Sequence, residues 1–192
     1  MAEAIQDCSD AEQLATASSV AVCHLVTTLG ARPFSDARLN KSFMKTVAGA
    51  FRDRVETITQ GGSAKAELLK LVIDSVFDAL HEALRDYEKL YVSPNAARFT
   101  FQLLNAMFGP YAALVKQADI RVTQNAELAT TILVHFLLTD GQLRLEHVNQ
   151  ECQELVFGLL YHNLNISQPN YKAFLRPDLA PGRLVLLGYC LT

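Results

Sequence analysis

The sequence has no tryptophan, no closely spaced cysteine pair and no long apolar run. The absence of tryptophan argues weakly against a dedicated stacking site or sugar platform. No apolar run reaches about 18 residues, so we expect no transmembrane helix. The first twenty residues lack a basic start followed by an apolar stretch, which argues against a secretory signal. We therefore expect an intracellular, cytoplasmic protein with no membrane span.

Sequence patterns that carry catalysis or metal binding are also missing. The stretch "HEALR" at His81 lacks the second histidine of an HExxH motif, and there is no ExxH pair of the di-iron type. The Gly61–Gly62 pair lacks the spacing of a phosphate-binding loop and suits a turn between helices. No histidine has another His or Cys three or four residues away. We therefore expect no catalytic site, no bound metal and no cofactor.

Positive charge is scarce as well. The formal net charge is −3, and acidic residues interrupt the richest run of Lys and Arg, which gives nucleic-acid binding no electrostatic support. The four cysteines are scattered, so in an intracellular protein we expect reduced, mostly buried thiols. They are Cys8, Cys23, Cys152 and Cys190.

Apolar residues are abundant, and their spacing is helical. Half of the 192 residues are apolar and 19% are charged, a balance that excludes intrinsic disorder. We predict that residues 1–192 form a single all-α domain of about six to eight helices. Short connections favour antiparallel helical hairpins, packed as a bundle or a short α-solenoid.

Helix boundaries are marked at several points. The predicted helices span residues 10–29, 36–60, 64–91, 94–117, 125–138 and 145–163, and an irregular proline-rich tail spans 165–192. The stretch "SDAE" predicts a capping box in which the Ser9 hydroxyl accepts from the Glu12 N–H. Pro94 suits a first helical position, and Pro110 predicts a break or kink. From Val20 onward the first helix is apolar nearly all round, so other helices should surround it.

Two inward stripes are especially regular. One runs through Leu39, Phe43, Val47, Phe51, Val55 and Ile58, and the other through Leu69, Ile73, Val76, Leu80, Leu84 and Tyr87. These stripes predict which faces of the second and third helices enter the core.

A row of carboxylates lies on the predicted helix 64–91. Its members are Asp74, Asp78, Glu82 and Asp86. Each has a basic or potentially basic neighbour three or four residues away, namely Lys70, His81, Arg85 and Lys89. A metal or acid–base site would need uncompensated carboxylates that face the core. We therefore interpret the row as the solvated face of the helix.

The apolar surplus favours a non-catalytic helical domain that binds a protein partner or self-associates. We choose Tyr171, Phe174 and Arg176 as candidate protein-binding residues because these residue types are frequent interface anchors. The alternative is a helical domain that binds a small apolar molecule or lipid in its aromatic-rich core. An enzyme with an unrecognised site is the least favoured interpretation.

Overall fold

The computed structural model describes residues 1–27, 37–59, 63–85 and 94–118, together with positions 120, 123, 125, 126 and 129. These residues form helices and no strand, which confirms the all-α prediction for this part of the chain. The helices are α1 (Ala2–Gln6), α2 (Ala11–Thr27), α3 (Ala37–Thr59), α4 (Ser63–Leu84), α5 (Pro94–Phe108), the 3₁₀ helix η1 (Gly109–Tyr111) and α6 (Ala112–Gln117). No helix in these ranges is both long and apolar enough to span a membrane.

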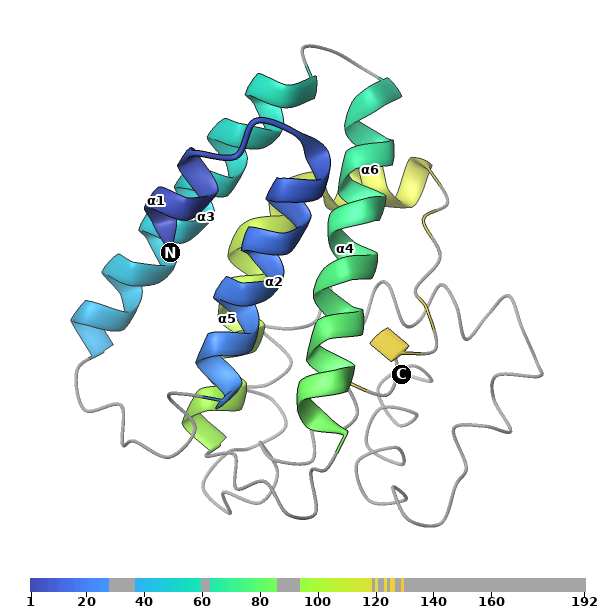
Figure 1. The fold of residues 1–192 in the computed structure, drawn as a ribbon. Coiled ribbons are helices and arrows are strands. Elements are labelled where there is room, and N and C mark those ends of the chain that lie inside the picture. The colour runs from blue at the N-terminus through green and yellow to red at the C-terminus, as the bar shows by residue number, and fades with distance from the viewer. Residues whose placement is uncertain are drawn as a thin grey trace, which may run out of the picture.

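Helix α2 lies between α3 and α4, with α5 behind it (Figure 1). Its most extensive packing is against α4, and the two helices run in the same direction. The chain direction is reversed in α3 and α5 (Figure 1). The consecutive helices α3 and α4 thus form the expected antiparallel pair, but α2 and α4 pack in parallel although they are not consecutive.

The start of α2 differs from the predicted capping box. The Gln13 N–H donates to Asp10 Oδ1 at 2.9 Å, so Asp10 caps the helix rather than Ser9. The Gln13 side chain reaches back, and its Oε1 accepts from the Ser9 N–H at 2.9 Å and from the Ser9 hydroxyl at 3.1 Å. A carboxylate is a stronger acceptor than a hydroxyl, which explains why the cap moves by one residue.

The C-terminal half of α2, from Val20 onward, is only partly enclosed by other helices. Ala21, Val22, Leu25 and Val26 are buried as predicted, but the Val20 side chain is 60% exposed. The expectation that other helices surround this segment was therefore wrong at Val20. The packing of α2 against α4 and α5 covers much of its surface and leaves one narrow face open.

The predicted stripes of α3 and α4 enter the core over most of their described length, although Phe43 and Ile58 of α3 are only partly buried. Val47, Phe51 and Val55 of α3 are buried, as are Leu69, Ile73, Val76, Leu80 and Leu84 of α4. Helix α4 ends at Leu84, earlier than the predicted residue 91. The Arg85 N–H donates to the Glu82 carbonyl at 3.3 Å, a contact three residues back that closes the last turn. Residues 86–91 lie outside the described ranges.

The Gly109–Pro110 break is confirmed. Pro94 occupies the first position of α5, and the chain passes through the 3₁₀ turn η1 before it continues as α6. A Cβ atom at position 109 would lie 2.9 Å from Asn105 Oδ1, so a side chain there would displace the Asn105 amide. The turn places Tyr111 beside α3, where its ring meets Phe51 edge to face with centroids 6.4 Å apart.

Helix α1 had no counterpart among the predicted helices. It is only five residues long, but it places Ile5 in the core and packs on α3. The cysteine prediction is confirmed for Cys8, which is buried, whereas Cys23 is only partly buried, and neither forms a disulfide. The helix predicted over 145–163, the tail and most of the helix predicted over 125–138 lie outside the described residues.

Candidate functional site

The predicted protein-binding residues Tyr171, Phe174 and Arg176 lie outside the described residues. They remain a prediction. The candidates that the structure does describe are the acidic row of α4, a groove between α1 and α2, and a polar link between η1, α3 and α4.

The described carboxylates of the acidic row all have partners. Lys70 Nζ lies 2.6 Å from Asp74 Oδ2, and Arg85 Nη1 lies 2.7 Å from Glu82 Oε1, which confirms these two predicted pairs. Asp78 instead accepts a hydrogen bond from the Asn125 amide, with Asn125 Nδ2 3.0 Å from Asp78 Oδ1. Asp86 lies outside the described residues.

This pairing gives each described carboxylate of the row a protein partner. Glu82 is 63% exposed at its side chain, and a pair exposed to this extent contributes only a few tenths of a kcal/mol. Within the described ranges, no group of three or more His, Cys, Asp or Glu side chains is placed to hold a metal ion. The interpretation of the row as a solvated helix face therefore fits Asp78 and Glu82, which are exposed. It does not fit Asp74, whose side chain is only 24% exposed and whose Oδ1 is buried without a hydrogen-bond partner.

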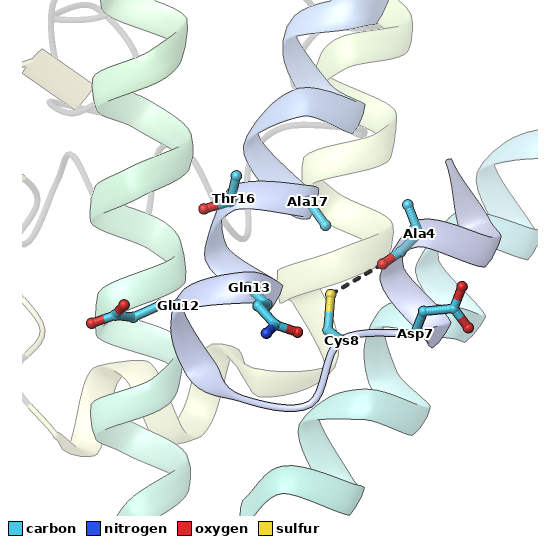
Figure 2. Close-up of a pocket in the computed structure, with 7 residues that line it drawn as sticks. All are labelled: Ala4, Asp7, Cys8, Glu12, Gln13, Thr16 and Ala17. Carbon is cyan, nitrogen blue, oxygen red and sulfur yellow. Dashed lines mark hydrogen bonds between the residues drawn. The ribbon is translucent and has the colours of Figure 1, made fainter.

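An open groove of about 480 Å³ lies between α1 and α2. Cys8 lines it beside Ala4, and residues of the first turns of α2 form its other wall (Figure 2). The carboxylates of Asp7 and Glu12 point away from Cys8 on opposite sides (Figure 2). The two acids therefore do not converge on one point.

The two described thiols, Cys8 beside the groove and Cys23 towards the C-terminal end of α2, are not activated. Burial raises the pKa of Cys8, with Asp10 and Asp7 adding to the rise and Arg54 opposing it. The Cys8 thiol donates to the Ala4 carbonyl, with Sγ 3.1 Å from the oxygen. Burial likewise raises the pKa of Cys23 to about 11. Both thiols stay protonated at neutral pH, whereas a nucleophilic cysteine needs a depressed pKa.

A polar link between η1, α3 and α4 was not foreseen from the sequence. Lys65 Nζ of α4 lies 2.6 Å from Glu56 Oε2 of α3, and the Tyr111 hydroxyl lies near enough to the same carboxylate for its charge to act on the pKa of the phenol. Burial first, and then the Glu56 charge, raise the pKa of Tyr111 to about 12, although Arg52 opposes the rise. A phenol held so firmly protonated is suited to donating a hydrogen bond, and we assign the link a structural role.

The histidines add no site within the described ranges. His24 and His81 are partly buried and lie on different helices, α2 and α4. Neither joins a group of potential metal ligands. His135, His147 and His162 lie outside the described residues.

Known proteins provide no further guide to the site. The chain matches no protein-family model, no curated protein and no solved structure.

Proposed function

We propose that this chain is a non-catalytic helical interaction domain, located in the cytoplasm, that assembles with a second copy of itself or with a protein partner. In this proposal the whole chain forms one domain, a bundle or a short α-solenoid of antiparallel hairpins. The proposal depends on an apolar surplus that a single domain of this size does not fully hide.

The observation that carries the proposal is the exposed apolar face of α2. Val20 is 60% exposed in the middle of this helix. One turn away on either side, Ala17 and Cys23 are partly exposed and apolar, and the exposed Thr16 borders them with a polar side chain. Leu71, on the neighbouring helix α4, is 39% exposed.

Catalysis has no comparable support among the described residues. Their thiols are protonated at neutral pH, and the carboxylates of the α4 row that the structure describes are paired. The one groove described above has diverging acids rather than converging polar groups.

The test is the mass of the purified chain in solution. We expect light scattering to give a mass above the 21.2 kDa of one chain, rising with protein concentration. Val20→Glu should shift the protein toward the monomer, because a charge would be desolvated in the interface. Thr46→Glu, at an exposed polar position on α3, is the matched control and should leave the mass unchanged.

A monomeric mass for the unaltered chain at every concentration would contradict self-association through this face. Equal masses for the unaltered chain and for Val20→Glu would exclude Val20 from the interface. Circular dichroism of each variant distinguishes a lost contact from a lost fold.

A further inference from the structure

We draw no further inference here: the strongest candidate beyond the proposed interface, the open groove between α1 and α2, carries nothing because its buried Cys8 thiol is already hydrogen-bonded to Ala4 and no second feature among the described residues indicates a ligand for the acids at its rim.

Discussion

The two sides of the core each bury both large and small side chains, but they differ in their most distinctive packing feature. Where α3 meets α5 and η1, the packing is aromatic, and the rings of Phe51 and Phe108 meet edge to face with centroids 5.5 Å apart. Helix α2, which packs most extensively on α4, instead buries small residues at several positions. These are Ala15, Ser18, Ser19 and Ala21.

The difference shows two ways of bringing helices together. Large rings fill the space between helices, whereas small residues allow helix axes to approach closely, since the axial distance depends on the side chains at the contact. The aromatic side should therefore be sensitive to loss of volume, and the small-residue side to its addition.

The largest loss of stability should come from removing a buried ring on the aromatic side of the core. Phe51→Ala removes a fully buried ring and should lower the free energy of unfolding by about 3–5 kcal/mol, measured by urea denaturation. Phe43→Ala, on the same helix but at a partly buried position, is the control and should cost clearly less. Equal losses for the two variants would show that the Phe51 ring has no special place in the core.

Adding volume at a buried small residue of α2 should cause the next largest loss of stability. Ala21 is fully buried on α2, so Ala21→Leu should lower the free energy of unfolding by about 1–3 kcal/mol. Ala64→Leu, at an exposed position on α4, should change it by less than about 0.5 kcal/mol. If urea denaturation finds Ala21→Leu as harmless as the control, the small-residue packing is loose rather than close.

Alkaline pH should lower the free energy of unfolding, because Tyr111, which packs on the aromatic side of the core, loses its proton. Its pKa is about 12 in the folded chain and 10.0 in the absence of its surroundings. The raised pKa contributes to the free energy of unfolding. This contribution is complete below pH 10 and is lost as pH rises from 10 to 12, because the unfolded chain gives up this proton first. The loss should be on the order of 2 kcal/mol.

Comparison with Tyr111→Phe isolates this contribution, because the variant keeps the ring and removes the ionisable hydroxyl. Urea denaturation at closely spaced pH values should show a shallower alkaline loss of stability in the variant. The same slope in both proteins would refute the role assigned to the Tyr111 proton.

The smallest effect concerns two neighbouring serines of α2. The Ser18 hydroxyl is fully buried without a hydrogen-bond partner, whereas Ser19 Oγ donates to the Ala15 carbonyl at 2.8 Å. Ser18→Ala should therefore raise the free energy of unfolding by about 1 kcal/mol, since it removes an unsatisfied polar group and gains helix propensity.

Ser19→Ala serves as the matched control for this pair. It gains the same helix propensity but loses a hydrogen bond, so its change should be smaller than that of Ser18→Ala. Thermal unfolding of both variants tests the ranking. A destabilised Ser18→Ala variant would mean that its hydroxyl does find a partner in solution.

Local signals in the sequence were enough for much of the helical part. The stripes through Phe51 and Leu80 predicted buried faces, and Pro94 and Pro110 marked a start and a break that the structure confirms. Periodicity and capping act over one or two turns, so a single sequence displays them. The short α1 was missed because five residues are too few for a periodic stripe.

The candidate sites depended more on distant contacts. Sequence spacing predicted the Lys70–Asp74 and Glu82–Arg85 pairs, which are three or four residues apart. It did not predict that Asp78 accepts from Asn125, 47 residues later in the chain. The link from Tyr111 to Glu56 was missed for the same reason, since it joins elements separated by two helices.

The sequence by itself therefore determined where the longer described helices form and which stripe of each is apolar, because those properties arise within a few turns. Only the tertiary structure decided that α2 packs in parallel on α4 and that Val20 remains exposed. Which helix covers which face depends on the fit of side-chain volumes between distant segments, and periodicity along one helix does not encode that fit.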